Sequence, residues 1–169
     1  MTITTKTGDN GRTDGFGGTR VFKDDVFCEA VGALDELNAW IGVCRRSTWN
    51  TDIEHTLHSV QHRLLDLGGQ LFTGVPAIDM EDVEELEEFI KQHEMPLGNF
   101  IIPKNNIHVA RAICRRAERK LVAINSPSYP MTHEAIKYIN RLSDCLFIMA
   151  IMDTGEPTEE WEKKIKEVK

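Results

Sequence analysis

Residues 107–125 read IHVARAICRRAERKLVAIN and carry the clearest helical pattern in the chain. Apolar side chains recur there every three or four positions, which is the spacing of one face of an α-helix. They are Ile107, Ala110, Cys114, Ala117, Leu121 and Ile124. Arg111, Arg115 and Glu118 stand at i, i+4 and i+7 and would form a polar face beside the apolar one. The pattern predicts a long helix that is buried on one side and charged on the other.

Four further segments show the same periodicity and favour helices: residues 30–46, 51–72, 80–94 and 132–153. Asp79 suits the N-cap of the third of these helices, and a proline lies beyond its end. No stretch shows sustained alternation of apolar and polar residues, so strands are at most marginal. Long amphipathic helices with short connections predict an all-α fold, namely a five-helix antiparallel bundle.

The length of 169 residues fits one domain that buries about 70% of its unfolded surface. We expect that domain to span residues 1–169. Within it, residues 1–26 would form a glycine-rich loop, residues 27–153 the helical bundle, and residues 154–169 a charged tail that is either helical or frayed.

The N-terminal loop combines glycines, hydroxyls and cations. Five glycines between positions 8 and 18 argue against a regular helix or strand there. Their backbone N–H groups can approach an anion closely, so the segment suits a polyphosphate. The hydroxyls and cations nearby are Thr5, Thr7, Thr13, Lys6, Arg12, Arg20 and Lys23. The alternative is a flexible basic tail.

Two common nucleotide motifs are missing from this loop. A Walker A motif requires a Gly-Lys pair that opens a helix, and no such pair follows these glycines. The dinucleotide fingerprint also fails, because Gly15-Phe16-Gly17 lacks the third glycine at its spacing. A nucleotide bound here would therefore occupy another architecture.

The net charge indicates which kind of ligand the chain can bind, and the cysteines indicate its cellular compartment. A formal net charge of −7 argues against a general binder of nucleic acid or of a membrane surface. The locally basic N-terminal segment favours a small anionic ligand. The four cysteines form no CxxC pair, and no signal peptide or transmembrane run is present. We therefore expect reduced thiols and a cytoplasmic location.

The polar helix faces allow more than one reading. Arg111 and Arg115 could clamp phosphate oxygens, or they could belong to a solvated face with surface ion pairs. Asp35 flanks the apolar stripe of the first helix, where it could orient an arginine of another helix or form an interhelical ion pair. On the last helix, Asn140 and Asp144 share a face with Ile151.

Three histidines stack on the second predicted helix. His55, His58 and His62 have the spacing i, i+3 and i+7, which could bind a metal. No Glu-x-x-His sequence occurs, so the ferritin-like di-iron pattern is absent. We interpret these side chains as an exposed stripe.

Several blocks, in this order along the chain, resemble the PduO-type ATP:cob(I)alamin adenosyltransferases. The blocks are TKTGDNG at 5–11, FGG at 16–18, Arg20, KDD at 23–25, GALDELN at 32–38, NFIIP at 99–103, ARAICRRAER at 110–119 and YINRLSD at 138–144. Together they reach across about residues 4 to 150. The arginine and asparagine blocks are the most specific.

The resemblance implies a homotrimer of five-helix bundles with ATP held between subunits. From one subunit, the N-terminal loop would contribute Thr5, Lys6, Thr7, Gly8, Asp9, Thr13, Gly17, Gly18, Arg20 and Lys23. The neighbouring subunit would contribute Arg115, Glu118 and Asn140. Mg²⁺ would accompany the ATP phosphates, with no protein ligand assigned.

The resemblance also implies the reaction and its remaining residues. Cob(I)alamin would attack C5′ of ATP, giving adenosylcobalamin and tripolyphosphate. Arg115, Arg111 and Asp35 would serve catalysis, with Asp35 paired to Arg111 across the interface. Phe100 would close the corrinoid pocket and help to strip the lower axial ligand from cob(II)alamin, which a partner reductase could then reduce.

Two positions depart from the family pattern. Only three residues, 104–106, separate the Phe100 block from the arginine helix, where family members carry a longer loop, and Ile151 stands where an arginine is expected. The nucleotide half matches without such departures. The alternatives to an enzyme are a module that binds ATP or corrinoid without turnover and a helical scaffold without ligand.

Overall fold

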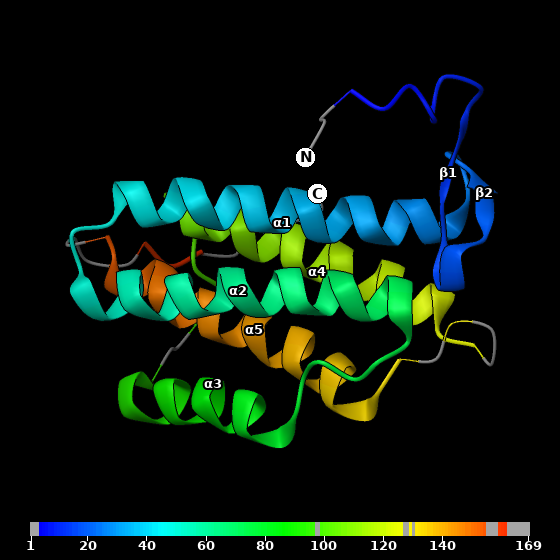
Figure 1. The fold of residues 1–169 in the computed structure, drawn as a ribbon. Coiled ribbons are helices and arrows are strands. Elements are labelled where there is room, and N and C mark those ends of the chain that lie inside the picture. Colours follow the sequence, from blue (N-terminus) through cyan, green and yellow to red (C-terminus); the bar gives the residue numbers. More distant parts are fainter. Residues whose placement is uncertain (1–3, 97–98, 127–128, 130, 155–158, 162–169) are drawn as a thin grey trace, which may run out of the picture.

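The computed structural model describes residues 4–96, 99–126, 129, 131–154 and 159–161, and its main elements are five helices (Figure 1). The helices are α1 Val26–Ser47, α2 Thr51–Thr73, α3 Met80–His93, α4 Asn106–Ile124 and α5 His133–Met152. Each agrees with a segment predicted from periodicity. The five-helix bundle is therefore confirmed.

The helices pack through their apolar faces. α1 contacts both α2 and α4, α4 contacts α5, and α5 contacts α3, which lies at the edge of the bundle (Figure 1). Leu37, Leu57, Leu121 and Leu142 are fully buried where these faces meet. Burial of such side chains is the main stabilising term of the fold.

Each of the five α-helices begins at a polar N-cap whose side chain accepts a hydrogen bond from the first turn. The caps of α1 to α5 are Asp25, Asn50, Asp79, Asn105 and Thr132. These caps satisfy backbone N–H groups that have no partner inside the helix. The helix boundaries are therefore set locally.

The cap of α3 is reciprocal. Asp79 accepts from the Asp82 N–H at 3.1 Å, and the Asp82 side chain accepts from the Asp79 N–H at 3.0 Å. We expect Asp79→Ala to lower the free energy of unfolding by about 1 kcal/mol, because an N–H loses its acceptor. Glu84→Ala, an exposed change within the same helix, is the control. Equal denaturation midpoints for the two variants would contradict the capping role.

The N-terminal loop contains a β-hairpin. Strands β1 (Arg12–Asp14) and β2 (Arg20–Phe22) pair antiparallel, with Thr13 opposite Val21. The prediction that glycines exclude a strand here was wrong. The glycines lie outside both strands, and Gly11, Gly17 and Gly18 adopt positive φ in the turns, so each three-residue stretch is free to pair.

Other sequence expectations can be compared directly. All four cysteines are free thiols; Cys44, Cys114 and Cys145 are buried, whereas Cys28 is half-buried. Among the described residues, no helix is long and apolar enough to span a membrane. Of the predicted tail over 154–169, residues 155–158 and 162–169 lie outside the described residues.

Candidate functional site

The N-terminal loop is folded around Arg20. Its guanidinium donates to Asp14 Oδ1 at 2.7 Å and to the carbonyl oxygens of Thr7 and Arg12 at 2.6 and 3.1 Å. Because three bonds converge on one planar group, Arg20 fixes the path of the segment. A structural role in shaping the loop thus accompanies the predicted contact with nucleotide.

Two lysines lie in the same loop. Lys6 adopts a positive φ of 59°, a left-handed conformation that is uncommon outside glycine and is often found at ligand sites. Lys23 folds over Gly8 so closely that a Cβ on residue 8 would lie 3.0 Å from Lys23 Nζ. A side chain at residue 8 would therefore make the Lys23 side chain shift by a few tenths of an ångström. The loop therefore places the Lys23 ammonium group next to glycine backbone at Gly8, with Lys6 in the same loop.

A second polar surface lies on α4 and α5. Asn140 Nδ2 donates to Glu118 Oε1 at 2.9 Å, which links the two helices. Arg115, one turn before Glu118, is exposed. The three residues predicted to hold nucleotide from the neighbouring subunit thus lie on one surface, which we call the α4/α5 face.

Arg111 lies deeper in the α4/α5 face than Arg115. Its guanidinium carbon is 5.0 Å from the centre of the Phe147 ring, a cation–π contact. Burial, followed by the nearby Arg115 charge, lowers the pKa of Arg111. Its Nε is buried and has no hydrogen-bond partner among the described residues. A buried unpaired N–H is costly, so the Nε of Arg111 is an unsatisfied donor within this face.

His108 lies at the edge of the same cluster. Its ring centre is 6.1 Å from that of Phe147, and burial, followed by the Arg111 charge, lowers the pKa of His108. A neutral imidazole adds no further cation beside Arg111. The positive charge of this cluster therefore comes from its arginines and not from His108.

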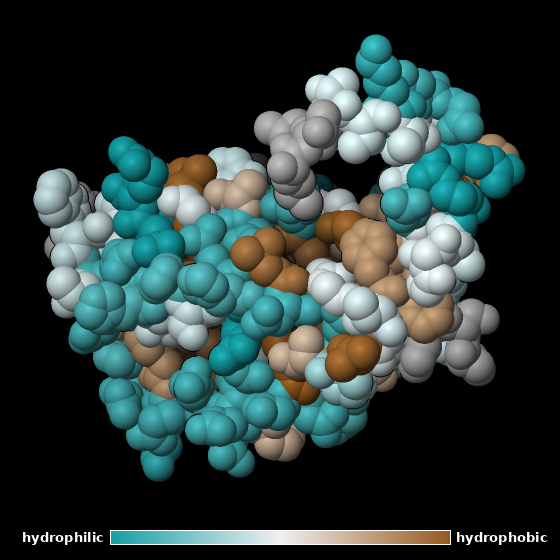
Figure 2. Space-filling view, viewed as in Figure 1, coloured by the Kyte–Doolittle hydropathy of each residue, from teal (hydrophilic) through white to brown (hydrophobic). Residues whose placement is uncertain are grey.

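Within one chain the N-terminal loop and the α4/α5 face remain separate. Residues 4–11 arch away from the bundle on the α1 side, and the space-filling view shows the segment standing off the body (Figures 1 and 2). Among the described residues, no hydrogen bond or ion pair joins residues 4–23 to Arg111, Arg115, Glu118 or Asn140. Each half is thus incomplete by itself.

Two further cations of α4, Arg116 and Lys120, contribute to the packing against α1. Arg116 pairs with Glu36, and Lys120 Nζ lies 3.1 Å from Glu29 Oε2. Asp35, next to Glu36, is exposed and has no ion-pair partner among the described residues. These ion pairs lie on the side of α4 that packs against α1. Asp35 and Arg115 take part in no ion pair among the described residues.

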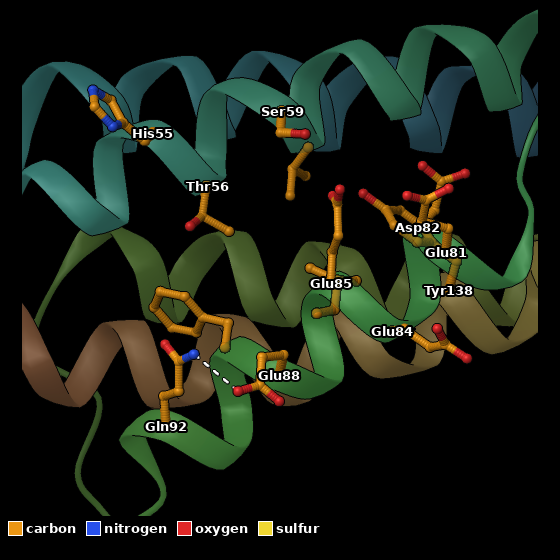
Figure 3. A pocket seen from close by; sticks show the side chains of 13 residues that line it. His55, Thr56, Ser59, Glu81, Asp82, Glu84, Glu85, Glu88, Gln92 and Tyr138 are labelled. Carbon is orange, nitrogen blue, oxygen red and sulfur yellow. Dashed lines mark hydrogen bonds between the residues drawn. The ribbon is translucent and has the colours of Figure 1, made fainter.

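A cavity of about 600 Å³ lies elsewhere, between α2 and α3 (Figure 3). Its rim is acidic, with Glu81, Glu84, Glu85 and Glu88, and its lining contains none of the predicted site residues. Clustered carboxylates repel a triphosphate. This cavity is therefore a poor nucleotide site despite its size.

One member of the histidine stripe, His55, lines that cavity. His55, His58 and His62 are exposed, as predicted, and the Nε2 atoms of His58 and His62 lie 3.3 Å apart. Among the described residues, no group of three or more His, Cys, Asp or Glu is arranged to hold a metal. The stripe contributes nothing to the α4/α5 face.

Comparison with known proteins decides the family. The sequence profile of a family described as cobalamin adenosyltransferase matches residues 3–153. The chain belongs to the cobalamin adenosyltransferase family. It is 41% identical to a corrinoid adenosyltransferase of Citrobacter freundii, an alignment covering 92% of this chain and 96% of that relative. A corrinoid adenosyltransferase of Bacillus subtilis (strain 168) is 36% identical, with 89% of this chain and 85% of that relative covered.

Solved structures of PduO-type adenosyltransferases share the fold. A phenylalanine-to-alanine variant of the PduO-type ATP:corrinoid adenosyltransferase from Lactobacillus reuteri, complexed with cobalamin and ATP, has a TM-score of 0.84. Its sequence is 29% identical, and the match covers 96% of this chain and 100% of that chain. The five-helix architecture is thus that of the cobalamin adenosyltransferase family.

The 104–106 connection and Ile151, the two places expected to depart from the family pattern, both have contacts that fit the fold of this chain. Asn105, in the short 104–106 connection, caps α4, and its Nδ2 donates to the Ala150 carbonyl at 2.8 Å. Ile151 follows the register of Asn140 and Asp144 but is buried, whereas those two are exposed. An apolar side chain at 151 is therefore consistent with its surroundings.

Sequence reasoning missed two aromatic residues that contact predicted site residues. Phe147 lies beneath Arg111, and its position seven residues after Asn140 could have placed it on the same face. Trp161 contacts Phe100, with ring centres 6.4 Å apart. No local pattern indicates that second contact, because the residues are far apart in the sequence.

Proposed function

We propose that this chain transfers the 5′-deoxyadenosyl group of ATP to cob(I)alamin, forming adenosylcobalamin and releasing tripolyphosphate. The observation that supports this proposal most strongly is the α4/α5 face. There, exposed Arg115 lies near Arg111, whose Nε is unpaired, and near the hydrogen-bonded pair Glu118–Asn140. Those residues belong to the sequence blocks that resemble the family. An arginine pair of this kind suits the oxygens of a triphosphate.

The reaction makes particular demands on the protein. The Co(I) electron pair forms a bond to C5′ while the C5′–O bond breaks, and tripolyphosphate leaves with that bond's electrons. Cobalt is already the nucleophile, so the protein's task is to align the reactants in line and keep them dry. Arg115, Lys6 and Lys23 would stabilise the charge that gathers on the leaving group.

In this proposal, Mg²⁺ would offset part of the negative charge of the ATP phosphates. The cation prefers oxygen ligands, retains several waters and is commonly bound through substrate phosphates. The N-terminal loop offers the Asp9 carboxylate and threonine hydroxyls but no dense acidic cage. We therefore infer that Mg²⁺ enters with ATP and neutralises the leaving group there.

The site is proposed to form between subunits of a homotrimer. The N-terminal loop of one subunit would cover ATP bound to the α4/α5 face of its neighbour, because the two halves lie apart within one chain. Exposed Asp35 would then pair with the half-buried guanidinium of Arg111 across the interface.

Removing the charge of Asp35 tests this interface. We expect Asp35→Asn to weaken trimer assembly and to lower activity, because breaking a desolvated charge pair costs about 3–5 kcal/mol. Sedimentation velocity and steady-state turnover measure the two effects. Glu36→Gln, which disturbs only the pair with Arg116 inside the chain, is the matched control. An unchanged trimer with unchanged kinetics would remove Asp35 from the interface.

Phe100 is proposed to act on the corrinoid. Its ring is 79% exposed, so it is available to a ligand on its side of the molecule. Against bound cob(II)alamin it would displace the lower axial ligand and make reduction feasible. A separate reductase would deliver the electron.

A cytoplasmic location stays a prediction from sequence.

Two measurements separate this function from its rivals. A helical scaffold predicts that ATP changes neither the melting temperature nor the proteolysis of residues 4–23. An ATP site saturated at one hundred times Kd should add about 2.7 kcal/mol of stability. A binding module without turnover would show that gain but no tripolyphosphate after reduced cobalamin is added. Stoichiometric tripolyphosphate supports the enzyme, and its absence supports the module.

A further inference from the structure

A short piece of chain near the C-terminus lies along the segment that carries Phe100. We call residues 159–161 the C-terminal strap and residues 99–102 the Phe100 segment. An antiparallel bridge joins Ile101 to Glu160. The contact brings together positions about sixty residues apart, so it belongs to the tertiary fold.

Backbone hydrogen bonds fix the register of this contact. The Ile102 N–H donates to the Glu159 carbonyl at 2.8 Å, and the Trp161 N–H donates to the Phe100 carbonyl at 2.7 Å. Both distances are short and well inside the normal range. The main chain at Phe100 is therefore held directly by Trp161.

Side chains add two further links. Asn99 Nδ2 donates to Glu160 Oε2 at 2.9 Å, and Lys104 Nζ lies 2.8 Å from Glu159 Oε2. Lys104 opens the 104–106 connection that departs from the family pattern. The short connection and the C-terminal strap are thus joined in this chain.

The same contact brings two aromatic rings together. The ring centres of Phe100 and Trp161 are 6.4 Å apart, with the planes inclined at 65° in an edge-to-face arrangement. Both residues remain exposed, by 79% and 46%. An edge-to-face pair of this kind restricts where the more exposed Phe100 ring can lie.

From this geometry we propose that Trp161 is a positioning residue for Phe100 in the corrinoid site. The inference rests on the proposed function. Trp161 holds the Phe100 backbone through its N–H and limits the Phe100 ring through its indole. It thereby keeps that ring where it displaces the lower axial ligand of cob(II)alamin. Trp161 would act through Phe100 and leave the reacting atoms untouched.

The test compares two routes to product in the full-length protein. One route supplies cob(II)alamin with a chemical reductant, and the other supplies preformed cob(I)alamin; both contain Mg-ATP. Trp161→Ala should slow the first route about three- to tenfold, the worth of one aromatic pair contact, and leave the second nearly unchanged. Trp161→Phe should restore the first route. Trp49→Ala, which removes an indole that is 99% exposed, is the matched control.

A spectroscopic readout and a double variant complete the test. Electron paramagnetic resonance of bound cob(II)alamin with ATP reports whether a nitrogen still ligates cobalt from below. Trp161→Ala should raise that ligated fraction. The double variant Phe100→Ala, Trp161→Ala should match Phe100→Ala alone, because a residue acting only through Phe100 adds no further loss.

Several outcomes would overturn the proposal. Equal losses on both routes, an unchanged resonance spectrum, or additive losses in the double variant would each assign Trp161 another role. If the unmodified protein makes no adenosylcobalamin from preformed cob(I)alamin, the proposed function itself fails. That failure is seen without any Trp161 variant, so the two are distinguishable.

Discussion

Arg115→Ala is expected to lower kcat/KM for adenosylcobalamin formation by at least about 100-fold, the usual cost of removing one donor to developing charge. The guanidinium is exposed on the α4/α5 face, and no described hydrogen bond ties it to the fold. It is therefore available to the triphosphate as the C5′–O bond breaks. Initial rates with preformed cob(I)alamin at saturating Mg-ATP measure the effect.

The same variant should remain folded and assembled. Because Arg115 is exposed, its truncation removes no core contact, and stability should change by less than about 0.5 kcal/mol. Arg119→Ala, one turn further along α4 and also exposed, is the matched control and should keep its activity. A near-normal kcat for Arg115→Ala, or an equal loss in both variants, would remove Arg115 from the leaving-group site.

Phe100→Ala is expected to slow the route from cob(II)alamin far more than the route from preformed cob(I)alamin. Displacing an axial ligand is a ground-state distortion, and such distortions are worth about 1–5 kcal/mol, so the loss should be at least roughly fivefold. Truncation of a ring that is 79% exposed leaves the core intact. Parallel assays of the two routes measure the difference.

The contrast between routes is the decisive feature of that experiment. A ring that only closed the pocket against water would affect both routes, because both share the transfer step. Equal losses would therefore contradict a role in ligand displacement. Trp49→Ala, at the turn between α1 and α2, controls for the loss of an exposed aromatic ring.

The helical fold could be predicted from sequence because its determinants are local. The stripe from Ile107 to Ile124 and the caps at Asp79 and Asn105 set helix positions to within a few residues. The hairpin β1–β2 was not predicted, because its pairing depends on turns at Gly11 and Gly15–Gly18 that bring the two strands side by side.

The candidate site could be predicted only in part. Helical spacing placed Arg111, Arg115 and Glu118 on one face, and in the structure Asn140 donates a hydrogen bond to Glu118. Spacing could not show that Arg111 is half-buried over Phe147 with a buried, unpaired Nε, since that depends on packing between helices. The contact between Trp161 and Phe100 depends on tertiary pairing and leaves no local pattern.

The loop residues illustrate a second limit. Composition marked Arg20 as a phosphate contact, whereas the structure gives it three bonds inside the loop. A guanidinium can hold a loop and still face a ligand, so the predicted contact stays a prediction. Charge counts identify a cationic segment but not which cations are already engaged.

The most direct test of the central proposal is an anaerobic incubation of the purified protein with Mg-ATP and chemically reduced cobalamin. The visible spectrum follows adenosylcobalamin while tripolyphosphate is assayed in the same sample. The account predicts that both products appear in equal amounts and that both fall sharply with Arg115→Ala but not with Arg119→Ala. ATP binding without either product would contradict adenosyl transfer and leave a binding module in its place.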